Sequence, residues 1–270
     1  MEKTMSRLQS YNYQSLVVKI GGSVLGSQDT SLQDIVELQQ QGTIPVVIHG
    51  GGQVISQWME KQGAQPSFVN GLRVTDDAGM EIVVATLGGL VNKNLVATIH
   101  KLGGRAIGMS GVDGGMLQAE ILNPAMGYVG RILQVDCSPI RQIVEGGYIP
   151  VIAPVALHVI DSSEHSGALL NINGDTAAGD IARALEAESI VFLTDVEGII
   201  DSNSELISNL TTGEAADLIS AGTVAGGMVP KVEACLRALE KVGVAQILDG
   251  RKSRALLDFV EGRPFGTRID

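Results

Sequence analysis

The chain has 270 residues, 44% of them hydrophobic but only 3% aromatic, so it can build a full core from aliphatic side chains. A formal net charge of −11 disfavours a general binder of nucleic acid or of anionic membranes. Cys137 and Cys235 lack metal-ligand spacing, and no charged-then-apolar leader or run of membrane-spanning length is seen, so we expect a cytoplasmic protein without zinc or disulfides.

Residues 1–15 are polar and mixed, and we expect a short N-terminal arm there. Short apolar runs and helical patterns then alternate. The expected strands are Leu16–Ile20, Pro45–Ile48, Ala106–Met109, Ile149–Val155, Ser189–Thr194 and Ala245–Leu248, with a hairpin over Asn123–Asp136. The expected helices are Leu32–Gln41, Val54–Gln62, Met80–Leu102, Pro139–Glu145, Thr176–Leu185, Gly213–Ala221 and Pro230–Val242.

Short buried strands separated by helices pair in parallel, because the helices provide the crossover connections. We therefore predict an α/β fold, a three-layer αβα sandwich around an open, mostly parallel sheet. The polar stretch Asp161–Gly167 is either a seam between two halves of the chain or an ordinary hairpin tip.

Three of these strands end in residues that suit anion binding: Lys19-Ile20-Gly21-Gly22, His49-Gly50-Gly51-Gly52 and Thr194-Asp195-Val196-Glu197-Gly198. Ligands in such folds gather at the carboxyl ends of the strands, and glycine N–H groups can surround anionic oxygens. One glycine pair alone more often marks a tight turn, whereas three such ends together favour a phosphate site. The chain has no Walker A loop, and no GxGxxG follows a strand, so it lacks the common nucleotide motifs.

Three charged residues are candidates for that site, and a fourth, Arg73, is a candidate for binding a carboxylate substrate. Lys19 interrupts an apolar strand, so its ammonium needs an anionic partner or must reach water from an edge strand. Lys231 begins a helix after a glycine pair, where a solvated surface lysine is the alternative. Asp175 either caps a helix, as Asn173 also could, or holds the two lysines in place. Arg73 has the planar fork that recognises a carboxylate, although a surface arginine is the alternative.

These residues, with the segments NGLRVT (70–75), LGGLVNK (87–93), NINGDTAA (171–178), LTDVEG (193–198) and GGMVPK (226–231), resemble the amino-acid kinase family over about residues 16–270. The resemblance implies one kinase domain with a substrate lobe, about 16–170, and a nucleotide lobe, about 171–270. It also implies ATP as a substrate, with Mg²⁺ held mainly by the nucleotide phosphates and no metal site of the protein's own.

Carried over by motif, the resemblance implies catalytic roles for Lys19, Lys231 and Asp175. It implies substrate binding by Gly51, Gly52, Arg73 and Asn171, and nucleotide binding by Gly21, Gly22, Thr194, Asp195 and Gly198. Motif order and spacing are most similar to members that phosphorylate the γ-carboxylate of N-acetyl-L-glutamate in arginine biosynthesis. Such a carboxylate is already anionic at pH 7, so it needs positioning and charge relief rather than a general base.

Three other functions compete with this interpretation. A kinase for carrier-protein-bound aminoadipate or glutamate should present a basic docking face, which the charge of −11 disfavours. A non-catalytic regulator of the same fold should lack a phosphate lysine, and a kinase for a phosphorylated isoprenoid or nucleotide should need another acceptor pocket. Departures from the family pattern are Gly174, where alanine is usual, and Asp249–Leu257, which lacks a proline-histidine pair. With its short arm, the chain is expected to form a homodimer insensitive to arginine.

Overall fold

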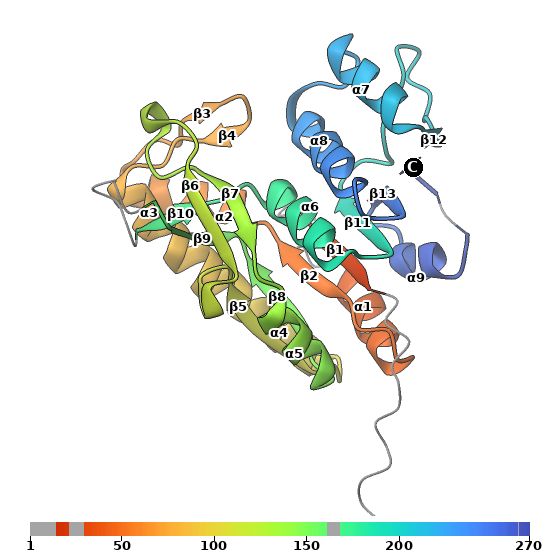
Figure 1. Ribbon diagram of the computed structural model, residues 1–270, viewed down its shortest axis with the longest axis horizontal. Helices are drawn as coiled ribbons and strands as arrows, with labels where there is room; N and C mark the ends of the chain where they lie inside the picture. The colour runs from red at the N-terminus through yellow and green to blue at the C-terminus, as the bar shows by residue number, and fades with distance from the viewer. Residues whose placement is uncertain (1–14, 22–29, 161–167, 264) are drawn as a thin grey trace, which may run out of the picture.

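The structure is a computed structural model that describes residues 15–21, 30–160, 168–263 and 265–270. Residues 1–14 of the expected arm, Gly22 and the stretch Asp161–Gly167 lie outside the described residues. Within these ranges an eight-stranded sheet has the spatial order β12 (Asn209–Leu210), β14 (Thr267–Ile269), β13 (Val244–Asp249), β11 (Ser189–Thr194), β1 (Leu16–Ile20), β2 (Val46–His49), β8 (Ile149–Ala153) and β5 (Ala106–Ser110) (Figure 1).

The strands from β13 to β5 all run parallel to their neighbours. Only the short β14 pairs antiparallel with β13, and β12 is parallel to β14 at the far edge. The sheet is therefore open and mostly parallel, as the alternation of strands and helices predicts. In Figure 1, β1, β2 and α6 lie between the green elements around β5 and the blue elements α7 to α9.

Helices cover both faces of this sheet, which confirms the three-layer sandwich. Alternate side chains of each strand enter opposite buried clusters, for example Val17 on one face and Val18 on the other. The first cluster includes α5 (Ser138–Glu145), α6 (Gly174–Leu185), α7 (Thr212–Ser220) and α8 (Val229–Ala238). The second includes α1 (Ser31–Gln40), α4 (Asn92–Lys101) and α9 (Ala255–Val260).

Two smaller sheets lie outside this sandwich. The first has the order β10 (Leu169–Asn171), β9 (Val155–His158), β6 (Leu117–Ile121) and β7 (Gly130–Val135), and the second pairs β3 (Phe68–Val69) with β4 (Leu72–Arg73). The expected hairpin exists, but it is formed by β6 and β7 and so begins at Leu117 rather than Asn123. The expected strand Ile149–Val155 is divided at Pro154, which has no N–H for a sheet ladder, so that Val155 begins β9 in the other sheet.

All of the expected helices are present, although α8 ends at Ala238 rather than Val242. Sequence patterns did not predict the strands of only two or three residues, β3, β4, β10, β12 and β14, nor helix α9. Further elements are helix α2 (Gly52–Lys61) and the short turns η2 (Asp113–Gly115), η3 (Pro124–Met126) and η4 (Gly226–Met228).

The helix expected over Met80–Leu102 is present, and it is both long and apolar. α3 (Asp77–Val83), the π-helical segment η1 (Val84–Val91) and α4 run continuously over Asp77–Lys101, with a window of mean hydropathy 1.5. By length and composition it passes the test for a membrane span, so the expectation that no run reaches that length is wrong. Its Leu95 and Ile99 belong to the cluster beneath the sheet, and Leu87 packs with α2, which is the setting of a core helix.

Candidate functional site

Lys19, Asp175 and Lys231 come together as an ion-paired triad. The Nζ atom of Lys19 lies 2.7 Å from one carboxylate oxygen of Asp175, and the Nζ atom of Lys231 lies 3.0 Å from the other. Lys19 lies in β1, which is an inner strand of the main sheet, and it pairs with Phe192 of β11 and Ile48 of β2. Its side chain lies on the face of the sheet that α6 covers. Three segments far apart in the sequence thus place two cations around one carboxylate.

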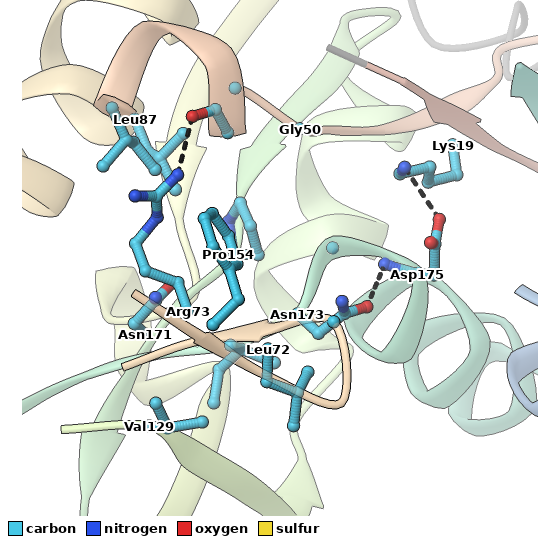
Figure 2. A pocket seen from close by; sticks show the side chains of 17 residues that line it. Lys19, Gly50, Leu72, Arg73, Leu87, Val129, Pro154, Asn171, Asn173 and Asp175 are labelled. Atoms are coloured by element: carbon cyan, nitrogen blue, oxygen red, sulfur yellow. Dashed lines mark hydrogen bonds and ion pairs between the residues drawn. The ribbon is translucent and has the colours of Figure 1, made fainter. Parts of the chain in front are cut away.

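Helix α6 begins in a way that leaves the Asp175 carboxylate free for the lysines. The side-chain oxygen of Asn173 accepts hydrogen bonds from the N–H groups of Asp175 and Thr176, at 2.9 and 3.1 Å. Asn173 is therefore the cap, and the capping role considered for Asp175 is wrong. Figure 2 shows this bond beside the Lys19–Asp175 pair.

The protonation states of the triad follow from burial and from the paired charges. Burial alone would raise the pKa of Asp175, but the nearby Lys19 and Lys231 outweigh it and hold that pKa below its ordinary value. Burial lowers the pKa of Lys19, against the attraction of Asp175. Asp175 is therefore an anion whose charge is shared between two ammonium groups, and each lysine can turn toward another anion.

Beside Lys19, the N-terminus of α2 opens onto a cavity of about 200 Å³. Gly51 is the N-cap residue, and no side chain caps this helix. The first N–H groups of a helix have no partner within it, and the positive end of the helix dipole attracts an anion there. A Cβ at Gly51 would lie 2.5 Å from the Cδ2 atom of Leu87, so a side chain there would have to displace that methyl group.

Arg73 closes the opposite end of this cavity (Figure 2). Its Nη2 donates to the Gly52 carbonyl oxygen and to the Ser56 hydroxyl, both at 2.8 Å, and its guanidinium lies 4.7 Å from the centre of the Phe68 ring. Arg73 is only 7% exposed, so it is not the surface arginine considered as the alternative.

Asn171 also lines the cavity, as the resemblance implies. Its side-chain amide donates to the Thr75 hydroxyl at 3.1 Å, and Thr75 in turn donates to the Arg73 carbonyl oxygen at 2.9 Å. Asn171 ends β10, so the small antiparallel sheet brings it to Arg73 from almost a hundred residues away. The cavity is lined by Lys19, Gly50, Gly51, Gly52, Ile55, Phe68, Gly71, Leu72, Arg73, Leu87, Val129, Pro154, Asn171, Ile172, Asn173, Gly174 and Asp175.

The residues expected to contact nucleotide are less closely gathered. Thr194 and Asp195 lie at the end of β11, where the Thr194 hydroxyl donates to the Asp195 carboxylate at 3.3 Å. The N–H of Gly21 is used within the sheet, since it donates to the Leu193 carbonyl oxygen at 3.1 Å. Gly198 packs closely against β14, where a Cβ would lie 2.6 Å from the Thr267 hydroxyl. None of these four lines the cavity that holds Lys19 and Arg73.

Sequence reasoning assigned no role to His49, Asn92 or Lys93, which form a polar network behind the cavity. Asn92 is fully buried at the start of α4, and its amide nitrogen lies 3.2 Å from Nε2 of His49. All three residues occur in segments that resemble the family, HGGG and LGGLVNK, so the signal was present. Only the structure shows that the two segments meet.

The site has the chemistry of a phosphate-binding site. No group of three His, Cys, Asp or Glu residues that could hold a metal ion occurs among the described residues. Two lysines, an uncapped helix N-terminus and an arginine instead supply positive charge and hydrogen-bond donors. Together with the mostly parallel sheet, this is the arrangement of an α/β protein whose strand ends can hold anionic, phosphate-bearing ligands.

Comparison with known proteins specifies the family. The model of the amino acid kinase family matches residues 14–248. An acetylglutamate kinase of Dehalococcoides mccartyi is 45% identical over 259 residues, covering 96% of this chain and 95% of the relative. One from Thermoanaerobacter pseudethanolicus is 44% identical, covering 93% and 85%. This chain belongs to the amino acid kinase family.

Solved structures agree with that assignment. A crystal structure of a Streptococcus mutans protein matches with a TM-score of 0.81 and 28% identity, covering 95% of this chain and 98% of that one. A Neisseria gonorrhoeae N-acetylglutamate synthase, solved with coenzyme A and N-acetyl-glutamate, has a TM-score of 0.81 and 27% identity, and the match covers 95% of this chain and 59% of that one.

Proposed function

We propose that this protein transfers the γ-phosphoryl group of ATP to the γ-carboxylate of N-acetyl-L-glutamate, giving N-acetylglutamyl phosphate and ADP in arginine biosynthesis. The observation that carries the proposal is the cavity with Lys19 and Asp175 at one end, where Lys231 pairs with Asp175, and with Arg73 at the other end. Relatives named acetylglutamate kinase, at 41 to 45% identity over nearly the whole chain, support the acceptor. They favour it over a carrier-bound aminoadipate or glutamate.

In this proposal the acceptor spans the cavity. The Arg73 guanidinium and the Asn171 amide bind the α-carboxylate and acetamide end of the substrate, which leaves its γ-carboxylate toward Lys19. The γ-carboxylate needs no base, because it is ionised at pH 7. The chemical task is to bring two anions together, and positioning together with charge relief accomplishes it.

Lys19 and Lys231 stabilise the charge on the transferring phosphoryl group, and Asp175 keeps both ammonium groups in place. The N–H groups of Gly51 and Gly52 at the start of α2 donate to the phosphoryl oxygens. Gly21, Gly22, Thr194, Asp195 and Gly198 border the nucleotide in this proposal. Mg²⁺ would neutralise part of the charge on the phosphates. It would be bound mainly by the phosphate oxygens, with at most one or two carboxylates such as Asp195 as further ligands.

The organisation of the protein is proposed on the same basis. Residues of about 16–170 form the lobe that binds the acceptor, and residues of about 171–270 form the lobe that binds ATP. The protein acts in the cytoplasm as a homodimer without arginine inhibition. In support of a dimer, β5 is the edge strand of the main sheet and its Ile107 side chain is 39% exposed. Light scattering after size exclusion tests this, and a mass of one chain contradicts it.

A coupled ADP-release assay tests the proposed reaction. With MgATP, the purified protein is expected to release ADP in the presence of N-acetyl-L-glutamate and to leave glutamate and aspartate almost untouched. Carrier-bound aminoadipate serves as a further acceptor. Faster turnover of the carrier-bound substrate than of free N-acetylglutamate would overturn the proposed acceptor, and no acceptor-dependent ADP release at all would overturn the kinase reaction.

A further inference from the structure

The carbonyl oxygens of the glycine loop Gly50–Gly52 are all engaged by hydrogen bonds. The oxygen of Gly51 accepts from the N–H of Ile55 at 3.0 Å, within α2, and the oxygen of Gly52 accepts from Arg73 at 2.8 Å. Among the described residues, the N–H groups of Gly51 and Gly52 have no partner. The loop thus presents two N–H donors to the cavity and no free carbonyl oxygen.

The third carbonyl oxygen, that of Gly50, is held by His49. The Nδ1 atom of this imidazole lies 2.8 Å from the Gly50 oxygen, which can only accept, so Nδ1 carries the proton. His49 is fully buried, and burial lowers its pKa to about 4, so the ring is neutral at physiological pH. Its Nε2 is then an acceptor, and the Asn92 amide nitrogen lies 3.2 Å from it.

Asn92 is fixed by the surrounding backbone in the orientation that His49 requires. Its amide nitrogen also lies 3.2 Å from the Met109 carbonyl oxygen and 2.9 Å from that of Val151, so the nitrogen must face this way. Its oxygen accepts from the Lys93 ammonium at 3.0 Å. Gly108 makes room for the pair, because a Cβ there would lie 2.0 Å from the Asn92 oxygen.

The Gly50 carbonyl and the Gly51 N–H belong to one planar peptide unit, so they point in opposite directions. Glycine on both sides of this unit removes the steric barriers that would otherwise restrict its rotation. If the unit turned over, a carbonyl oxygen would replace an N–H at the place where an anion binds. The hydrogen bond from His49 opposes that rotation.

We infer that His49 and Asn92 are positioning residues for phosphoryl transfer, which lock the Gly50–Gly51 peptide with its N–H toward the phosphoryl group. This role rests on the proposed function, since it concerns the same glycine loop. His49 acts through the backbone and takes no proton from the substrate. Asn92 sets the tautomer of His49, and Lys93 sets the orientation of Asn92.

The test compares His49→Leu and Asn92→Leu with a matched control, Gln39→Leu. The amide of Gln39 donates to the Arg105 and Gly147 carbonyl oxygens, next to the amino ends of β5 and β8, whereas Asn92 contacts the same two strands toward their carboxyl ends. Asn92→Leu and Gln39→Leu therefore both lose amide contacts to β5 and β8, although Gln39 is only half-buried. Of these three variants, only those at His49 and Asn92 alter the network behind the glycine loop.

Loss of one transition-state donor lowers kcat by about a hundredfold, so His49→Leu and Asn92→Leu are expected to lose at least about tenfold in kcat. The KM for N-acetyl-L-glutamate should change little, and Gln39→Leu should keep its kcat. His49→Asn places an amide nitrogen near the former Nδ1 and should recover part of the lost rate. An unchanged kcat in His49→Leu, or an equal loss in Gln39→Leu, overturns the inference.

A second measurement needs neither turnover nor a variant. Nitrogen NMR of ¹⁵N-histidine-labelled protein should show His49 protonated at Nδ1 and unprotonated at Nε2, unchanged from pH 8 to pH 6. An Nε2-protonated or a charged His49 overturns the inference even if the enzyme is active. If the parent releases no ADP, the proposed function fails, while this spectrum still decides the tautomer.

Should His49→Leu not fold, Lys93→Met at the exposed end of the network replaces it, and a kcat equal to that of the parent counts against the inference.

Discussion

Asp175 and Lys19 are paired with each other, yet their removal should have very different consequences. Asp175→Asn removes the negative charge between the ammonium groups of Lys19 and Lys231. The amide that replaces the carboxylate also places an NH₂ group, which is a donor, next to at least one of these ammonium groups. Lys19 and its carboxylate partner have side chains only 8% and 6% exposed, so little water can replace the lost charge. Breaking a buried ion pair by removing one partner costs about 3–5 kcal/mol, and we expect Asp175→Asn to lose that much unfolding free energy.

Lys19→Met should be far milder for stability. Asp175 keeps Lys231 at 3.0 Å, and the buried ammonium, which is costly to desolvate, is replaced by an apolar chain of similar length. A change within about 1 kcal/mol is expected. The double variant Lys19→Met/Asp175→Asn should be more stable than Asp175→Asn alone by about 1–2 kcal/mol, because it no longer buries two unpaired cations.

Activity should rank the two variants differently from stability. Lys19 faces the acceptor cavity, and the loss of one charge-stabilising donor costs about 3 kcal/mol, or roughly two orders of magnitude in kcat. Urea denaturation measures the stabilities, and the ADP-release assay measures kcat. The reasoning is refuted if Lys19→Met keeps near-parental turnover, or if it destabilises the protein as much as Asp175→Asn does.

Arg73→Ala should raise the KM for N-acetyl-L-glutamate by about tenfold or more with a smaller change in kcat, because a charged hydrogen bond to the acceptor is lost; an unchanged KM contradicts this. Gly179→Ala should lower both thermal stability and kcat, because its Cβ would lie 2.7 Å from the Ala234 carbonyl oxygen and push α8, which carries Lys231, away from α6. Gly174→Ala is the matched control at the start of the same helix, where the nearest atom is 3.5 Å away, and it should melt no lower than the parent. Burial raises the pKa of Asp34 to about 6 in the folded protein, so the folded state binds this proton more tightly and loses stability as pH rises from about 4 to 6. Asp34→Asn should remove that part of the pH dependence. Urea denaturation at pH 4 and pH 7 measures the free energy of unfolding of the parent and of the variant. If this free energy changes with pH by the same amount in both proteins, Asp34 makes no such contribution.

Much of the fold could be predicted because its signals are local. Buried strands such as β11, and β1 apart from Lys19, are short apolar runs, and the helices between the strands have a clear periodicity, so parallel pairing could be predicted. The small sheets could not be predicted, since β3 and β4 have two residues each and owe their form to pairing with each other. Polar positions in β6 similarly hid the first strand of the hairpin.

The candidate site divides in the same way. A lysine inside an apolar strand, glycines after two strands and an arginine within NGLRVT all carry a chemical meaning that can be read along the chain, because desolvation and backbone freedom are properties of single residues. Whether Asp175 is a cap or a counterion could not be read in that way, since Asn173 two positions earlier is an equally suitable cap residue for the same helix.

Only the tertiary structure decided which of these groups meet. Lys19, Asp175 and Lys231 come from three elements that touch because the parallel sheet and its covering helices bring strand ends and helix starts to one edge. The link from His49 to Asn92 needs the long helix to pass behind the glycine loop, a contact between segments more than forty residues apart. The chain sequence thus determines the donors and acceptors, while packing determines which carbonyl oxygens are engaged and which N–H groups remain free to bind an anion.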